Sequence, residues 1–190
     1  LISSMDNKTK AKFYFLKGKA LSGKKEFKAA SVTFKELFDL ENKTGKKRYS
    51  SEATLIKNQI LQEVYQLASD QYTAKEYQKA SDNFYLTYKL NPIDTSFIYN
   101  AAACSTLAKN YDLSLNYYEE LKDLGYTGIT TLYFATSIAN DSKENLQTKS
   151  NRDLKVKLGL YKDPVDEVTE SKYAEIIKNI GYIYVNQGKP

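Results

Sequence analysis

One spacing pattern constrains this chain more than any other feature: aromatic, small, aromatic and leucine recur three times at nearly the same offsets. The three stretches are FKAASVTFKELFDLEN at 27–42, YQKASDNFYLTYKLNP at 77–92 and YDLSLNYYEELKDLGY at 111–126. In each, the small residue and an aromatic residue four positions later lie on one helix face. Ala80 and Ser114 are 34 residues apart, which is the period of a helix-turn-helix repeat. The sequence therefore predicts a mainly α protein built from helix pairs.

The segments that precede these stretches are predicted to be the first helices of the pairs. They read AKFYFLKGKALSGKKEF, LQEVYQLASDQYTAKEY and TSFIYNAAACSTLAKNY, and each is apolar on one face. Gly18, Ala68 and Ala102 are small residues within these three segments. Pro92 follows the second stretch at a point where a helix should end.

With the three helix pairs aligned at these offsets, the chain resembles the tetratricopeptide repeat (TPR) superfamily over roughly residues 11–126. The C-terminal YAEIIKNIGYIYVNQGK also resembles a TPR first helix, with Gly181, Tyr184 and Gly188 at the family's positions. The resemblance implies a TPR-type α-solenoid of antiparallel helix pairs that is a fragment of a longer bacterial array. The implied segments are three pairs at 11–42, 61–92 and 95–126 and the first helix of a truncated repeat at 171–190.

The first departure from this pattern lies between repeats one and two, where Ala30 and Ala80 are 50 residues apart. The extra residues fall within 43–60, where TGKKRYS at 44–50 is typical of an exposed basic loop. After it, Ser50 or Ser51 is predicted to cap a helix. We therefore expect the first helix of repeat two to be extended at its N-terminus.

The second departure is an insertion at 127–170. ITTLYFATSI favours a strand, although its register also suits a helix. SNRDLKVKLGL is ambiguous, because Ser150 with Asp153 resembles a helix start whereas Leu154, Val156 and Leu158 alternate as in a strand. Our interpretation is an irregular insertion with a short β-hairpin followed by a short helix. It either carries a specific function or only caps or bends the solenoid.

A TPR resemblance implies that the first helices line a concave groove that binds a peptide or a partner helix. The tyrosines among the groove positions would supply contact area, and Gln66 and Asn100 would bond a peptide backbone. The alternative is that many of the 17 tyrosines only pack between helices. The implied groove residues are Lys12, Phe15, Lys19, Gln62, Tyr65, Gln66, Ser69, Tyr72, Ser96, Tyr99 and Asn100.

The composition excludes several kinds of catalytic and metal site. The chain has no histidine and a single cysteine, Cys104, which excludes Ser-His-Asp and Cys-His catalysis, histidine-bearing metal sites and an internal disulfide. Cys104 lies in an apolar helical stretch and is interpreted as a buried structural thiol. We expect no catalytic residues, no cofactor and no metal, and hence a protein that is not an enzyme.

The predicted partner is a protein or peptide bound in the groove of a scaffold. The alternative is a structural or assembly component that acts, by self-association or docking, through the array ends and the 127–170 insertion. A basic nucleic-acid-binding surface is a less favoured alternative, because residues 1–50 carry 13 Lys and Arg against 5 Asp and Glu but no nucleic-acid-binding motif accompanies them. No apolar run reaches 18 residues, so no transmembrane segment is predicted. The resemblance favours export to the bacterial cell envelope over a cytoplasmic location.

Overall fold

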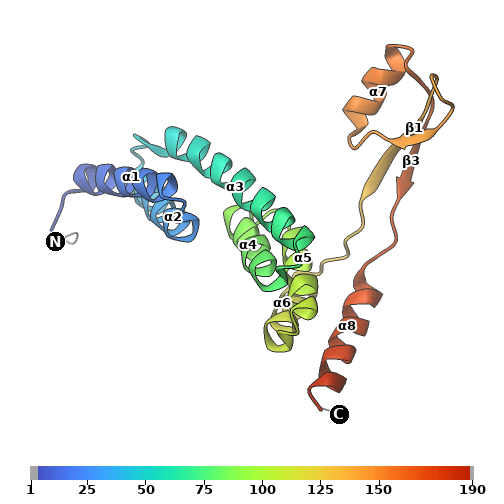
Figure 1. The fold of residues 1–190 in the computed structure, drawn as a ribbon. Coiled ribbons are helices and arrows are strands. Elements are labelled where there is room, and N and C mark those ends of the chain that lie inside the picture. The colour runs from blue at the N-terminus through green and yellow to red at the C-terminus, as the bar shows by residue number, and fades with distance from the viewer. Residues whose placement is uncertain (1–3, 189–190) are drawn as a thin grey trace. The chain divides into compact units, whose positions relative to one another are not determined.

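The computed structural model describes residues 4–188, which form eight α-helices and one antiparallel sheet, so the prediction of a mainly α fold is confirmed (Figure 1). The chain divides into two compact units, the first ending at Leu121 and the second starting at Lys122. The first unit holds three helix hairpins, apart from the last two residues of α6: α1 (Asn7–Gly23) with α2 (Phe27–Thr44), α3 (Ser50–Thr73) with α4 (Tyr77–Leu90), and α5 (Ser96–Leu107) with α6 (Tyr111–Asp123).

The three hairpins share one turn. Each turn has a lysine with positive φ, namely Lys25, Lys75 and Lys109, at 60°, 61° and 60°. The N–H of this lysine bonds the carbonyl three residues earlier, and the next N–H bonds the carbonyl five residues earlier. These bonds satisfy carbonyls at the end of the first helix. The chain thus repeats one helix-turn-helix geometry three times.

Small and aromatic residues make the helices of each pair cross closely. Ala30, Ala80 and Ser114, the small residues of the sequence pattern, are all fully buried, as predicted. At Gly18 of α1, a Cβ atom would lie only 2.5 Å from Cε1 of Phe34 in α2. A larger residue at position 18 would therefore collide with the ring that packs against it.

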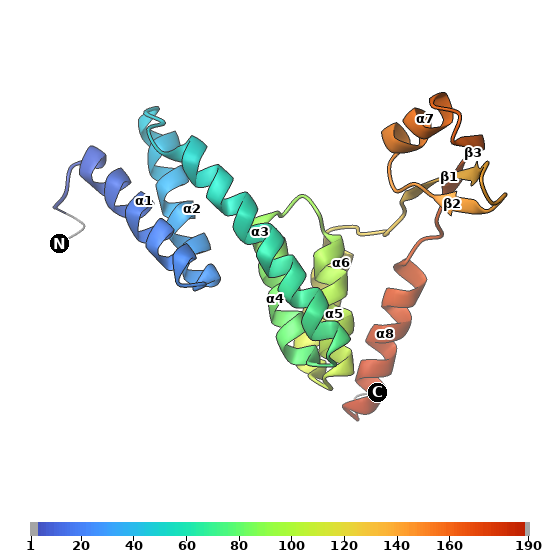
Figure 2. The same ribbon diagram turned by 45° about the horizontal axis from the view of Figure 1, so that its top comes forward.

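α3 is long enough to contact both neighbouring hairpins (Figure 2). Its N-terminal half supplies Ala53 and Ile60 to a core shared with α1 and α2. Farther along, the ring of Tyr65 lies 6.3 Å from that of Phe84 in α4 and 5.8 Å from that of Phe97 in α5. One continuous helix therefore joins the first hairpin to the other two, in agreement with the predicted extension.

The start of α3 is held by Glu41 of α2 and not by a serine cap. Ser50 is the first helical residue, and the N-cap residue, Tyr49, makes no side-chain capping bond. The buried Glu41 carboxylate accepts hydrogen bonds from the N–H groups of Arg48, Tyr49 and Ser50 and from the Ser50 hydroxyl, at 2.6–3.0 Å. The prediction that Ser50 or Ser51 caps the helix is wrong, because a carboxylate from the preceding helix occupies the capping position.

The second unit contains a three-stranded antiparallel sheet in the order β2-β1-β3, formed by β1 (Thr131–Ser137), β2 (Lys143–Asn145) and β3 (Tyr161–Val168). β1 and β2 form a hairpin, and α7 (Lys149–Lys157) follows it and contacts β1 and β3. The buried Arg152 of α7 pairs with Asp166 of β3 and lies over the ring of Tyr133. This segment therefore holds the expected hairpin and helix, and a third strand that the sequence pattern did not indicate.

The last described helix is α8 (Tyr173–Asn186), which buries Ile176 and Ile183 on one stripe. It ends as the first helices of the hairpins do. Gly188 has a φ of 66°, and its N–H bonds the carbonyl of Val185 three residues earlier.

Candidate functional site

The predicted groove residues of α3 share one face of that helix. Gln62, Tyr65, Ser69 and Tyr72 follow one another at helical spacing, and all except Ser69 are exposed. Tyr72 is 49% exposed, and its ring lies 5.8 Å from that of Tyr77. Tyr65 contacts Phe97 of α5, so this face of α3 borders α5.

The predicted groove residues of α5 lie at its N-terminal half. Tyr99 and Asn100 are half-buried. Ser96 is the first residue of α5, and its N–H and hydroxyl both bond the Asp94 carboxylate. The Tyr65–Phe97 contact connects these residues to the groove face of α3, so seven of the eleven predicted positions belong to neighbouring surfaces of α3 and α5.

The other four positions behave differently. Phe15 of α1 is 6% exposed and stacks on Tyr49 at 4.9 Å, so it is a core residue and offers no groove surface. Lys19 lies over the Phe15 ring and bonds Glu52 of α3 at 3.1 Å. Lys12 is exposed on α1. Gln66 lies one helical turn after Gln62 and donates a hydrogen bond to Asp70 within α3.

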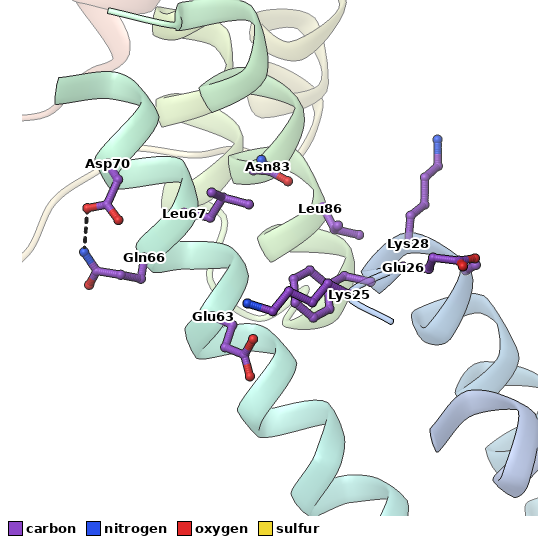
Figure 3. Close-up of a pocket in the computed structure, with 11 residues that line it drawn as sticks. Lys25, Glu26, Lys28, Glu63, Gln66, Leu67, Asp70, Asn83 and Leu86 are labelled. Atoms are coloured by element: carbon purple, nitrogen blue, oxygen red, sulfur yellow. Dashed lines mark hydrogen bonds between the residues drawn. The ribbon is translucent and has the colours of Figure 1, made fainter. Parts of the chain in front are cut away.

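Gln66 also lines a cavity of about 700 Å³, together with Glu63, Leu67 and Asp70 of α3 (Figure 3). Two further cavities, of about 580 and 500 Å³, continue along the space between α2 and α4. We call this set of cavities the α2–α4 cleft. The lining residues used below are Lys28, Val32 and Lys35 of α2, Lys57, Glu63 and Leu67 of α3, and Asp82, Asn83, Leu86 and Lys89 of α4.

One wall of the α2–α4 cleft is a network of aromatic and charged groups. Tyr85 stacks on Tyr117 at 4.4 Å and donates a hydrogen bond to Glu120 at 3.0 Å. Lys89 lies 4.5 Å from the centre of the Tyr85 ring and 3.8 Å from the Glu120 carboxylate. Burial raises the pKa of Tyr85 and of Tyr117, so both phenols stay neutral at physiological pH.

Neither surface carries an evident reactive group. Cys104 is buried in α5, and burial raises the pKa of its thiol to about 11, which leaves almost no thiolate near neutral pH. Among residues 4–188, no group of three or more cysteine or acidic side chains is arranged to hold a metal ion. Within the same residues, every helix is too short or too polar to span a lipid bilayer.

Comparison with protein-family models, with curated proteins and with solved structures finds no match for this chain. Its function is therefore inferred from its own residues and geometry.

Proposed function

We propose that this protein is a non-enzymatic TPR-type scaffold that binds a partner peptide or helix on the groove face of α3 and α5. The observation that carries the proposal is the repeated turn. Lys25, Lys75 and Lys109 adopt the same left-handed conformation with the same hydrogen bonds. Helix pairs joined by one repeated geometry stack into extended surfaces, and such surfaces suit peptides and helices.

The groove face has chemistry that fits a peptide. Tyr65 and Tyr72 present large side chains with few rotatable bonds, so they supply contact area at a low cost in conformational entropy. Gln62 and Asn100 carry amide groups that both donate and accept hydrogen bonds, as a peptide backbone requires. Tyr65 also touches Phe84 and Phe97, so Tyr72 is the better tyrosine to replace in a test.

The test is selection of binders from a display library of random peptides. We expect selected peptides to lose binding to a Tyr72→Ala/Asn100→Ala variant by roughly tenfold or more, because truncating an aromatic contact and an amide partner removes interface energy. Tyr173→Ala is the matched control, since Tyr173 is 48% exposed on α8. Binders that survive the groove variant as well as the control would contradict this proposal.

A second candidate is an assembly role for the second unit. Ile138 and Leu160 are exposed and adjacent, because the Ile138 N–H bonds the Leu160 carbonyl, and Leu158 is exposed at the end of α7. Exposed apolar clusters of this kind favour protein contacts. Sedimentation separates the two candidates, because a monomeric mass at high micromolar concentration excludes self-association through this cluster.

A further inference from the structure

The α2–α4 cleft is one continuous depression. Lys28, Asn83 and Leu86 line both the first and the second cavity, and Val32 and Lys89 line both the second and the third. The shared residues mean that the three cavities open into one another along α2 and α4. A single elongated ligand therefore has access to all of them.

The floor of the cleft is apolar and accessible. Val32 is 59% exposed although it lies in the middle of α2. Leu67 of α3 and Leu86 of α4 face the same space as Lys25 of the α1–α2 turn (Figure 3), and Phe27, the first residue of α2, also lines it. The cleft thus offers apolar side chains that a partner would cover with a gain in free energy.

The two ends of the cleft differ in charge. At one end Lys35, Lys57 and Lys89 surround Val32 and Pro92, and no carboxylate lines this cavity. Lys57 has no ion-pair partner among residues 4–188, whereas Lys35 pairs with Asp39 at 2.6 Å and Lys89 lies 3.8 Å from Glu120, two carboxylates outside the cavity lining. At the other end the lining carboxylates outnumber the lysines, since Glu26, Glu63 and Asp70 accompany Lys25 and Lys28. The cleft is therefore basic at one end and acidic at the other.

We infer that the α2–α4 cleft binds an acidic amphipathic segment of a partner protein. Its carboxylates lie beside Lys35, Lys57 and Lys89, and its apolar side chains cover Val32 and Leu86. From Lys25 to Lys35 the cleft follows ten residues of chain, or about 15 Å as helix, which accommodates about three helical turns. Gln66 is a predicted groove residue that also lines the cleft, but Val32, Lys35 and Lys57 lie outside the predicted groove, so the inference is independent of the proposed function.

Charge complementarity selects this partner over nucleic acid. A polynucleotide presents a phosphate at every step and would meet Glu63, Asp70 and Asp82 along the same cleft. A peptide places its carboxylates at one end only and presents neutral or basic groups at the other. The apolar side chains Val32 and Leu86 also match leucine-like side chains better than they match a sugar-phosphate backbone.

The test uses fluorescein-labelled twelve-residue peptides with Glu and Asp in one half and Leu at helical spacing, measured by fluorescence anisotropy. The control peptides, called amide peptides below, carry Gln and Asn in place of Glu and Asp. We expect the acidic peptides to bind about tenfold more tightly than the amide peptides at low salt, because the Lys35, Lys57 and Lys89 end attracts carboxylates. Added salt should narrow this difference.

Two cleft variants and one control locate the site. A Lys35→Gln/Lys57→Gln variant should lose about tenfold in affinity, because it removes one exposed and one half-buried lysine. Val32→Asp should lose at least as much, because it places a carboxylate at an exposed apolar position. The matched control is Lys43→Gln/Lys79→Gln, which removes two exposed lysines of α2 and α4 that do not line the cleft. The groove variant Tyr72→Ala/Asn100→Ala should also bind as the wild type does.

Each opposite result overturns the inference. Equal affinity for the acidic and amide peptides, or no binding at about 1 mM peptide, would show that the cleft does not bind an acidic segment. An equal loss of affinity in the Lys43→Gln/Lys79→Gln control would show that the net charge of the protein, and not the cleft, causes the effect. Tighter binding of a twelve-nucleotide single strand reassigns the cleft to nucleic acid. Self-association that disappears in the Lys35→Gln/Lys57→Gln variant assigns it to a second copy of this chain.

Discussion

At the scale of single residues, Glu41 is the clearest case of a polar group that organises the fold. Its carboxylate is 1% exposed and accepts hydrogen bonds from three consecutive backbone N–H groups and from a serine hydroxyl. Burial alone would raise the pKa of Glu41, but the hydrogen bonds from Ser50, Arg48 and Tyr49 outweigh it and hold the pKa below its usual value of 4.5. The group therefore stays charged in the folded protein.

Replacing this carboxylate with an amide should destabilise the first unit. In Glu41→Gln the amide NH₂ would face backbone N–H groups, so buried donors lose their acceptor and the free energy of unfolding falls by about 2–4 kcal/mol. Glu63→Gln on the exposed face of α3 is the control and should change it by less than about 0.5 kcal/mol. Urea unfolding followed by circular dichroism measures both.

The same measurement has a defined pH dependence. Since the folded pKa of Glu41 is below the unfolded one, its stabilisation is complete above about pH 4.5 and is lost as the pH falls through the folded pKa. The difference between wild type and Glu41→Gln should therefore shrink from pH 6 to pH 3. A difference that stays constant over this range would show that the carboxylate charge is not what holds the start of α3.

At this scale the sequence predicts burial correctly where two side chains that pack together are separated by a helical spacing. The burial of Ala30 and Ala80 follows from their place four residues before an aromatic side chain. The sequence does not indicate that Glu41 caps α3, because its hydrogen-bond partners come seven to nine residues later, after a loop. Ser50 is the local residue that the sequence favours as the cap. The TPR resemblance predicts Phe15 in the groove, but the ring of the loop residue Tyr49 covers it.

At the scale of elements, helices with strong periodicity were predictable and the third strand was not. β3 reads YKDPVDEV, which lacks apolar alternation and contains a proline. It is an edge strand, where proline and charges are tolerated because one side of its backbone stays unpaired. Its place is fixed by pairing with β1 and by the Arg152–Asp166 ion pair, and both depend on residues distant in sequence.

The α1–α2 crossing gives a prediction at this scale. Gly18→Ala would place a Cβ atom 2.5 Å from the Phe34 ring, so the helices must separate and the free energy of unfolding should fall by about 1–3 kcal/mol. Gly23→Ala is the control in the same helix, because a Cβ there meets nothing within 4 Å and should be neutral or stabilise by about 0.5–1 kcal/mol. Thermal unfolding measures the change in stability of both variants. Equal changes in Gly18→Ala and Gly23→Ala would argue against a close crossing of α1 and α2.

At the scale of the whole molecule, the length of α3 decides which surfaces exist. The extra residues between the first two repeats were readable from the spacing of Ala30 and Ala80, and they appear as a loop and the first turns of α3. The cleft between α2 and α4 is not predictable from the sequence. Lys28, Val32 and Leu86 lie off the buried stripes of their helices, and periodicity alone classes such residues as ordinary solvent-exposed positions.

Cys104 offers a probe of the first unit as a whole, since it is its only thiol and is buried in α5. Burial raises the pKa of the thiol from 9.0 to about 11, so at pH 8 the thiolate fraction is about a hundredfold lower than in the unfolded chain. We expect iodoacetamide to label the native protein more than a hundredfold slower than the urea-unfolded protein, because steric protection adds to this factor. Glu41→Gln should speed native labelling by lowering the cost of opening. Native labelling that is as fast as in urea would show that the thiol is accessible without unfolding.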